Sequence, residues 1–248
     1  MKKIIITNSQ YSHLWDIIND YNHKNILICT DSLNGYNFKH KTFIYNNDLN
    51  YVRRLIEILN NVDDEYVMVF SDVDIVLNID ESVVSLYKDI MIENNLDRIS
   101  FGVFNKNKDT IEKNGFLVTS INNISDNHFY TPYDYAPSLY KKSSLLKLCE
   151  SFPNETYPSF ETNEDVQNFA NENFKFYGLQ KSEKINLVYH RGFVFSSDLN
   201  FLHITVKGKL LNLDYYYDLK NNILEIIDKY KLNLETTQED RFISKNEI

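Results

Sequence analysis

Short apolar runs alternate with amphipathic stretches along the first 104 residues. The runs are rich in β-branched and aromatic residues, which predicts buried strands at residues 4–7, 25–30, 42–45, 66–70 and 98–104. Between them, apolar residues recur at helical spacing, as in Leu14, Ile17, Ile18 and Tyr21. Similar faces occur at residues 52–59 and 83–90. This alternation of strand and helix is typical of a parallel, doubly wound α/β sheet.

The pattern becomes less regular after residue 104. Short apolar pieces occur at residues 116–119, 129–130, 138–140, 187–189 and 201–205, and helical spacing returns near residues 143–149, 163–173 and 214–230. We therefore expect one compact domain over residues 1–233, with a regular half at 1–104 and an irregular half at 105–233. Residues 234–248 form a polar tail, which we expect to fray.

Composition narrows the class of protein. Hydrophobic residues make up 43% and charged residues 25% of the 248 residues, as in ordinary globular proteins. No apolar run approaches the roughly 18 residues of a membrane span, and the apolar segment after Met1 is too short for a signal peptide. Cys29 and Cys149 stand far apart, so they predict neither a disulfide framework nor a zinc site, and we expect a cytoplasmic protein. A net charge of −9 argues against nucleic acid as a partner.

Two carboxylates follow the most apolar run of the chain. Asp72 and Asp74 come directly after Tyr66 to Ser71 and are separated by one residue. Ligands of open α/β sheets bind outside the carboxyl ends of the strands. Carboxylate oxygens there suit Mg²⁺ or Mn²⁺, which would also take the phosphates of a substrate. The plainer alternative is a solvated turn in which Asp74 caps the segment that follows.

Other polar residues are expected at the same edge of the sheet. Thr7 to Ser9 follow the first strand, and Asp31, which could accept a hydrogen bond from a base or a ribose, follows the second. Arg54 could reach a phosphate, although a solvated helix surface would equally explain it. Tyr11 or Trp15 could lie near the base, but a Trp within a helix is more often part of the core.

Several segments resemble one family of enzymes. Tyr66 to Leu77 resembles the strand and the DxD metal motif of GT-A glycosyltransferases, which use nucleotide sugars. Ala136–Lys142, Tyr157–Glu161 and His203–Lys209 are similar, in this order, to segments of a viral and bacterial branch that includes the capsid-glycan glycosyltransferases of large DNA viruses. Tyr140 departs from that branch, which has Trp there, and the second segment matches more loosely. The resemblance covers most of residues 3–215.

The resemblance implies a GT-A-like, Rossmann-like fold whose C-terminal half faces the acceptor. It implies a metal-dependent enzyme, using Mn²⁺ or Mg²⁺, that moves a hexosyl or deoxyhexosyl group. The donor would be a nucleoside-diphosphate sugar, expected to be UDP-linked, and the acceptor a glycan or glycoprotein. Inversion is the expected stereochemistry. For a viral protein, the location would be the host cytoplasm or the virion.

The resemblance also suggests roles for later residues. Glu161 stands where the family has the general base of an inverting transferase, with Asp165 as the second candidate. The alternative for both is an acid near the start of the next helix. Lys207 and Lys209 would contact the donor diphosphate, unless they are solvated lysines of a hairpin turn. His203 could be a third metal ligand, although a lone His on a strand is more often structural.

Two other classes of protein fit part of the pattern. Asp72 to Val76 also matches the aspartate motif of haloacid-dehalogenase-like phosphatases, and Leu117 to Ser120 resembles their second motif. In those enzymes the first motif normally follows the first strand, whereas two strand–helix units precede Asp72. A non-catalytic sugar-binding module is the third possibility.

Overall fold

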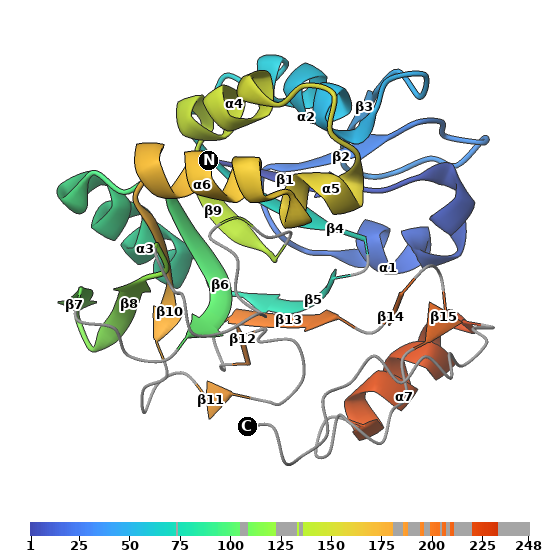
Figure 1. Ribbon diagram of the computed structural model, residues 1–248. Helices are drawn as coiled ribbons and strands as arrows, with labels where there is room; N and C mark the ends of the chain where they lie inside the picture. Colours follow the sequence, from blue (N-terminus) through green and yellow to red (C-terminus); the bar gives the residue numbers. More distant parts are fainter. Residues whose placement is uncertain are drawn as a thin grey trace, which may run out of the picture.

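The computed structural model describes most of the chain. The described residues are 1–72, 74–104, 109–122, 133, 136–180, 186–187, 194–195, 199–203, 205–206, 209–210 and 220–232. Within them the chain forms a large mixed sheet flanked by helices, and a second, smaller sheet beside it (Figure 1).

The large sheet has nine strands in the order β3-β2-β1-β4-β9-β6-β10-β8-β7. Their bounds are β1 Lys2–Ile6, β2 Ile26–Thr30, β3 Lys41–Ile44, β4 Tyr66–Ser71, β6 Arg98–Phe104, β7 Thr110–Lys113, β8 Phe116–Ser120, β9 Ser138–Lys141 and β10 Phe176–Gln180. Strands β1 to β4 are mutually parallel, and β6 and β10 run in the same direction because β9 lies antiparallel between β4 and β6. Strand β8 is antiparallel to β10 and to β7. The sheet is therefore mostly parallel, as expected.

The smaller sheet joins the segment after the two aspartates to the C-terminal half. Its order is β11-β12-β13-β5, with β5 Asp74–Ile79, β11 Asn186–Leu187, β12 Val194–Phe195 and β13 Leu199–His203. A separate hairpin pairs β14 Thr205–Val206 with β15 Lys209–Leu210.

Helices cover both faces of the large sheet. They are the 3₁₀ helix η1 Ser9–Leu14, α1 Trp15–Asp20, α2 Tyr51–Asn60, α3 Glu81–Asn94, α4 Lys142–Ser151, α5 Tyr157–Thr162, α6 Glu164–Asn173 and α7 Lys220–Tyr230. Apolar residues of α1 and α3 form one core with Ile5, Ile28 and Met68. Those of α2, α4, α5 and α6 form the other with Ile4 and Leu27. Successive strand residues thus enter opposite cores, which explains why the strands are apolar throughout.

These observations confirm an α/β, GT-A-like fold with a mostly parallel sheet flanked by helices. The order β3-β2-β1-β4 is that of the first strands of a Rossmann fold. The division into halves at residue 104 stays a prediction. The apolar piece at 129–130, the start of the expected 214–230 helix and the polar tail at 234–248 lie outside the described residues.

Several elements differ from the expectation, among them strand β7 at Thr110–Lys113, for which no strand was predicted. Asp74 begins strand β5 instead of capping a turn, and Glu161 lies inside the short helix α5. Strand β10 was not expected because it contains Gly178, which is unfavourable within a strand. The ring of Phe104 on β6 occupies the space beside that glycine. None of the described helices is both long enough and apolar enough to cross a membrane.

Candidate active site

The site lies at the point where the order of strands across the sheet reverses. From β1 the chain adds β2 and β3 on one side, and then crosses to add β4 on the other side of β1. Ligands of open α/β sheets bind at such a switch point, outside the carboxyl ends of the strands. Ile6 pairs with Ser71 at these ends, and the backbone N–H of Asp72 donates to the carbonyl of Ile6 at 3.1 Å. Thr7 and Asp72 therefore lie side by side, just after the carboxyl ends of β1 and β4.

Asp72 is a buried carboxylate, only 6% exposed. Its Oδ2 accepts a hydrogen bond from Thr7 Oγ1 at 2.6 Å. Burial raises the pKa of Asp72 to about 7, and the nearby charge of Asp74 raises it further, against the hydrogen bonds from Thr7 and the Asn8 backbone. A negative charge at this position is thus unfavourable without a cation.

Asp74 is also buried, with 2% of its surface exposed. Its Oδ2 accepts from Ser71 Oγ at 3.1 Å and from the Ser71 backbone N–H at 3.3 Å. The chain therefore turns tightly between β4 and β5 and returns the second carboxylate toward the first. The alternative of a solvated turn is wrong, because both acids are shielded from water.

His203 pairs with Asp74 in the ladder between β13 and β5. This register brings a residue from far along the chain to the position opposite the second carboxylate. Among the described side chains, no cluster of three His, Cys, Asp or Glu residues could hold a metal. The side chain of His203 lies outside that set, so its role as a ligand stays a prediction.

Ser9 and Asp31 join the ends of β1 and β2. The backbone N–H and the hydroxyl of Ser9 donate to the two carboxylate oxygens of Asp31 at 2.6 and 2.9 Å. Burial opposes ionisation of Asp31, but these bonds and one from Thr30 outweigh it and hold the pKa of Asp31 below its ordinary value. The carboxylate keeps lone pairs for a ligand, since each carboxylate has about four acceptor sites.

Trp15 belongs to the core, as the simpler interpretation of a helical Trp suggested. It is fully buried, and its ring centroid lies 5.4 Å from that of Tyr36 and 5.0 Å from that of Phe38. It therefore has no free face for a base. Tyr11 remains partly exposed, and burial together with the charge of Asp72 raises its pKa. Of the two aromatic candidates, Tyr11 is the one that lies near the crevice with accessible surface.

Arg54 is engaged with the backbone of the loop before its own helix. Its Nε and Nη2 donate to the carbonyls of Leu49 and Asn47 at 2.7 and 2.8 Å. Its guanidinium lies 5.3 Å from the ring centroid of Tyr45, whose hydroxyl donates to the Thr7 carbonyl at 2.7 Å. Arg54 is thus connected to the end of β1 through Tyr45, which sequence reasoning missed. A phosphate contact by its remaining N–H groups stays a prediction.

Glu161 and Asp165 differ in their surroundings. Glu161 is half-buried near the end of α5, and its carbonyl accepts from Gln167 Nε2 at 2.5 Å. Asp165 is exposed in the first turn of α6. Phe160, the aromatic residue before Glu161, is fully buried against Tyr133, with ring centroids 4.8 Å apart.

The exposed aromatic of this helix is Tyr157, one turn before Glu161. It is 43% exposed, and its ring meets that of Tyr51 edge-on at a centroid distance of 5.0 Å. The residues are four apart, so they lie on the same side of the helix. Tyr157, and not Phe160, is therefore the aromatic that a bound molecule could contact beside Glu161.

The expected basic segment is only partly described. The backbone of Lys209 pairs with Val206 in the β14–β15 hairpin. This agrees with the hairpin that was the alternative interpretation. Lys207 lies outside the described residues, and the contact of both lysines with a diphosphate stays a prediction.

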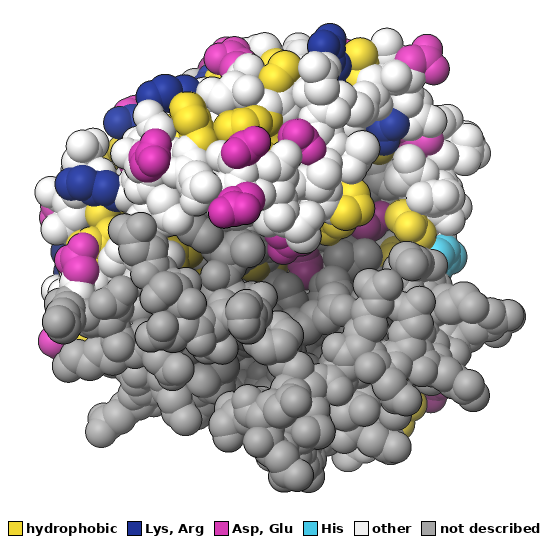
Figure 2. Space-filling model, in the orientation of Figure 1, with side chains coloured by type: hydrophobic (Ala, Val, Ile, Leu, Met, Phe, Trp, Pro, Cys, Tyr) yellow, Lys and Arg dark blue, Asp and Glu magenta, His cyan; other side chains and the backbone are white. Residues whose placement is uncertain are grey.

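Acidic side chains dominate the visible surface around the site. In Figure 2 they are gathered over α5 and α6, and others lie in a recess below these helices. Helices α5 and α6 contribute Glu161, Glu164, Asp165 and Glu172. A surface of this charge would repel a diphosphate unless a cation were bound first.

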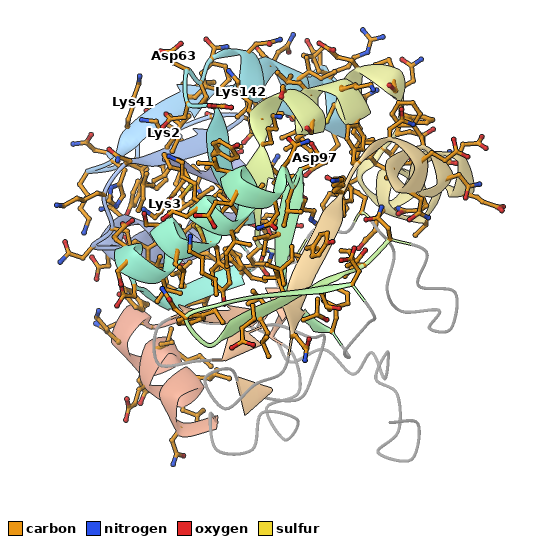
Figure 3. All side chains as sticks on the ribbon, turned by 90° about the vertical axis from the view of Figure 1, so that its left-hand side faces the viewer. Lys2, Lys3, Lys41, Asp63, Asp97 and Lys142 are labelled. Carbon is orange, nitrogen blue, oxygen red and sulfur yellow. The ribbon has the colours of Figure 1, made fainter. Side chains whose placement is uncertain are left out.

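Charged residues also lie at the amino ends of the parallel strands, and two of the buried or partly buried ones, Lys3 and Asp97, are bonded within the protein. Figure 3 looks onto this end of the sheet, where the labelled residues stand at the amino ends of the parallel strands. The buried Lys3 donates to Glu81 at 2.6 Å and to the Lys24 carbonyl at 3.1 Å. Asp97 accepts from Ser144 and from the backbone of Lys175. These bonds explain Lys3 and Asp97 as structural residues.

The second phosphatase motif is not brought to the aspartates. Leu117 to Ser120 lie on β8, and β9, β6 and β10 separate that strand from β4. Thr119 is buried and bonded to Thr110 on β7. The arrangement therefore disfavours a haloacid-dehalogenase-like mechanism.

Comparison with known proteins finds likeness in structure alone. No family model matches the sequence, and no curated protein matches it significantly. The bifunctional IspDF from Campylobacter jejuni is similar with a TM-score of 0.41 and 13% identity, over 79% of this chain and 52% of that one. TarS 1-349 from S. aureus gives 0.43 and 13%, over 74% and 59% of the two chains. HddC from Yersinia pseudotuberculosis gives 0.44 and 12%, over 90% and 100%.

This chain thus spans little more than half the length of the IspDF and TarS chains. TarS has also been solved in complexes with UDP-GlcNAc and with UDP. At such identities and TM-scores, the likeness does not assign a function to this chain.

Proposed function

We propose that this chain is a metal-dependent glycosyltransferase that uses a nucleoside-diphosphate sugar, with UDP as the nucleotide. The observation that carries the proposal is the pair of buried carboxylates, Asp72 and Asp74, at the switch point of a mostly parallel sheet. The resemblance of this segment to the metal motif of GT-A enzymes supports the same interpretation.

The carboxylates fit a hard divalent cation. Asp72 forms no ion pair with any described residue, and its raised pKa reflects the difficulty of holding a negative charge there. Carboxylate oxygens are the ligands that Mg²⁺ and Mn²⁺ prefer. Asp72 and Asp74 would hold the ion, with His203 as a possible third ligand from the paired strand. When bound, the cation would supply the positive charge that stabilises a diphosphate leaving group.

The remaining residues would bind and orient the two substrates. Ser9 and Asp31 would lie against the nucleoside, and Arg54, Lys207 and Lys209 against the phosphates. Glu161 would take the proton of an acceptor hydroxyl as its oxygen attacks the anomeric carbon. The bond from that carbon to the diphosphate oxygen would break in the same step, with inversion. The acceptor would be a glycan or a glycoprotein.

Binding of UDP with and without Mn²⁺ tests the proposal. We expect tight UDP binding by calorimetry only when Mn²⁺ is present, and its loss in Asp74→Asn. The control is Asp89→Asn, which removes the same charge from an exposed site on α3 and should bind like the wild type. An unchanged affinity in Asp74→Asn, with metal present, would contradict a metal role for this residue.

Assays of product release distinguish a glycosyltransferase from a phosphatase and from a non-catalytic sugar-binding module. A glycosyltransferase should release UDP from at least one UDP-sugar, slowly by hydrolysis or faster with an acceptor. A phosphatase would instead release inorganic phosphate from a phosphomonoester. A sugar-binding module would do neither, even though it bound the nucleotide sugar.

A further inference from the structure

A line of two buried hydrogen bonds ends on the first aspartate. Trp15 Nε1 donates to Thr7 Oγ1 at 3.0 Å, and Thr7 Oγ1 donates to Asp72 Oδ2 at 2.6 Å. All three residues are buried. They come from η1–α1, β1 and β4, so the line crosses the switch point.

When Asp72 is ionised, as it must be to bind a cation, the chemistry of the three groups fixes the direction of both hydrogen bonds. The indole N–H can only donate, and an ionised carboxylate can only accept. A hydroxyl has one proton, so Trp15 occupies Thr7 as an acceptor and leaves its proton for Asp72. The proton of the Thr7 hydroxyl is therefore committed to Asp72, and a contact between Thr7 and a nucleotide stays a prediction.

Both supporting residues are themselves held in place. The backbone N–H of Thr7 donates to the carbonyl of Cys29 at 2.9 Å, and its carbonyl accepts from the Tyr45 hydroxyl at 2.7 Å. The indole of Trp15 packs against Tyr36 and Phe38, whose rings also contact each other. The donor aimed at Asp72 thus rests on a rigid part of the core.

We infer that Thr7 and Trp15 are positioning residues, which hold the Asp72 carboxylate in the orientation that binds the divalent cation. This inference rests on the proposed function. With one lone pair of Oδ2 fixed by Thr7, the carboxylate presents its remaining lone pairs in one orientation. Partners of this kind tune metal ligands, and their loss typically weakens metal affinity by roughly 10–100-fold.

The alternative is a purely structural bond that fills a polar gap in the core. The two roles make different predictions for variants. A structural bond affects the free energy of unfolding and leaves the metal affinity of the folded protein unchanged. A positioning role changes the metal affinity through Asp72, and a shorter side chain with a hydroxyl should restore it.

The test measures Mn²⁺ affinity by the electron paramagnetic resonance of free Mn²⁺, with the stability of each variant measured in parallel. We expect Thr7→Val, which keeps the shape but loses the hydroxyl, to bind Mn²⁺ roughly 10–100-fold more weakly. Thr7→Ser should bind nearly as well as the wild type. Trp15→Phe should show a smaller loss in the same direction. The control is Thr119→Val, which removes another buried hydroxyl of the same sheet, on β8, and should not change Mn²⁺ affinity.

A cycle with Asp72→Asn shows whether the effect passes through that residue. Thr7→Val should add no further loss of Mn²⁺ affinity to Asp72→Asn. Normal Mn²⁺ binding by Thr7→Val, or an equal loss in Thr7→Ser, would overturn the inference while leaving the proposed function intact. Absence of Mn²⁺ binding by the wild type, with and without UDP, would overturn both.

Trp15 also provides a readout that needs no variant of Thr7. It is the only Trp of the chain, so selective excitation of indole reports on this one residue. Mg²⁺, which does not quench by paramagnetism, should shift its emission in the wild type and not in Asp72→Asn. An unchanged emission, under conditions where Mg²⁺ displaces bound Mn²⁺, would contradict a rigid link from Trp15 to the metal ligand.

Discussion

Glu161 and Asp165 are four residues apart, yet their surroundings differ. Glu161 is half-buried on the same side of its helix as the exposed ring of Tyr157, whereas Asp165 is exposed in the first turn of α6. A carboxylate in the first turn of a helix is explained by the helix dipole alone. Glu161 has no such explanation, because it lies at the C-terminal end of α5. This difference favours Glu161 as the base.

We predict that Glu161→Gln lowers the rate of sugar transfer by roughly 10²–10⁴-fold, the usual contribution of a general base. Its affinity for the UDP-sugar should hardly change, because a base acts on the acceptor hydroxyl in the transition state. Steady-state kinetics and calorimetry measure the two quantities. Asp165→Asn is the control and should retain transfer. The opposite result would identify Asp165 as the base, and normal rates in both variants would argue against inversion with a protein base.

The contact between Ser9 and Asp31 should contribute to stability in a pH-dependent way. The pKa of Asp31 is lower in the folded protein than in the unfolded chain. The stabilisation is therefore present above the unfolded pKa of about 3.9 and is lost as pH falls through the folded value. Ser9→Ala removes the hydroxyl bond and should lower the free energy of unfolding by roughly 0.5–1.5 kcal/mol near neutral pH.

Urea denaturation of Ser9→Ala and wild type, from neutral pH downward, tests this prediction. The difference between them should stay constant down to about pH 5 and shrink at lower pH, as Asp31 takes up a proton in both proteins. Ser12→Ala, at an exposed serine of the same 3₁₀ helix, is the control and should show no such trend. A difference that is independent of pH would show that the bond does not depend on the charge of Asp31.

At the scale of elements, the pairing of β6 with β10 depends on the close approach of the Phe104 ring to Gly178 and Gly102. A Cβ at Gly178 would lie 2.1 Å from Phe104 Cδ2, and one at Gly102 would lie 3.1 Å from Phe104 Cε2. Phe104 is buried, so its ring has little room to move. The register between β10 and β6 shifts immediately after Gly178, which is where the ring is accommodated.

We therefore predict that Gly178→Ala destabilises the protein by roughly 1–3 kcal/mol, the usual range for overpacking. Gly102→Ala should destabilise the protein less. The contact of its Cβ with Phe104, at 3.1 Å, requires only a small shift of the ring, and alanine also lowers the conformational entropy of the unfolded chain, which favours folding. Urea denaturation of both variants measures the difference. Equal stability would mean that the ring of Phe104 moves freely, and that the glycine is not required for the pairing.

The turn between β4 and β5 shows how one element depends on another. Ser71 binds Asp74 through both its hydroxyl and its backbone, so the turn is closed locally. The strand that follows is then fixed by β13 and by the buried Tyr21, whose hydroxyl accepts from the Val76 N–H at 2.9 Å. The second aspartate is thus placed partly by its neighbours in sequence and partly by residues far from it.

For the whole molecule, the amino ends and the carboxyl ends of the parallel strands have different roles. At the amino ends of the strands, Lys3 is paired with Glu81, and Asp97 is bonded to the backbone of Lys175 (Figure 3). The carboxyl ends of β1 and β4 carry buried acids without a described cation beside Asp72. These acids lie at the end of the sheet where open α/β sheets bind their ligands, which is where we propose the cation binds.

The sequence by itself determined most of the strands and helices over the first 104 residues, but it did not predict β5. A strand covered by helices on both faces must be apolar throughout, and a helix on a sheet must be apolar on one side, so these patterns are local. The same reasoning placed Asp72 and Asp74 at the end of a buried strand. It failed at β10 and α5, where a glycine and a six-residue length weaken the periodic signal.

Only the tertiary structure decided which strands lie side by side and which residues meet at their ends. Thr7 and Asp72 are 65 positions apart, and Asp74 and His203 are paired although most of the chain separates them. No periodicity records that β4 joins β1 on the side opposite β2, or that β9 is inserted antiparallel beside it. Strand pairing and buried hydrogen bonds depend on residues distant in sequence, whereas apolar periodicity reports only the local direction of burial. The bond from Trp15 through Thr7 to Asp72 could therefore be found only in the folded protein.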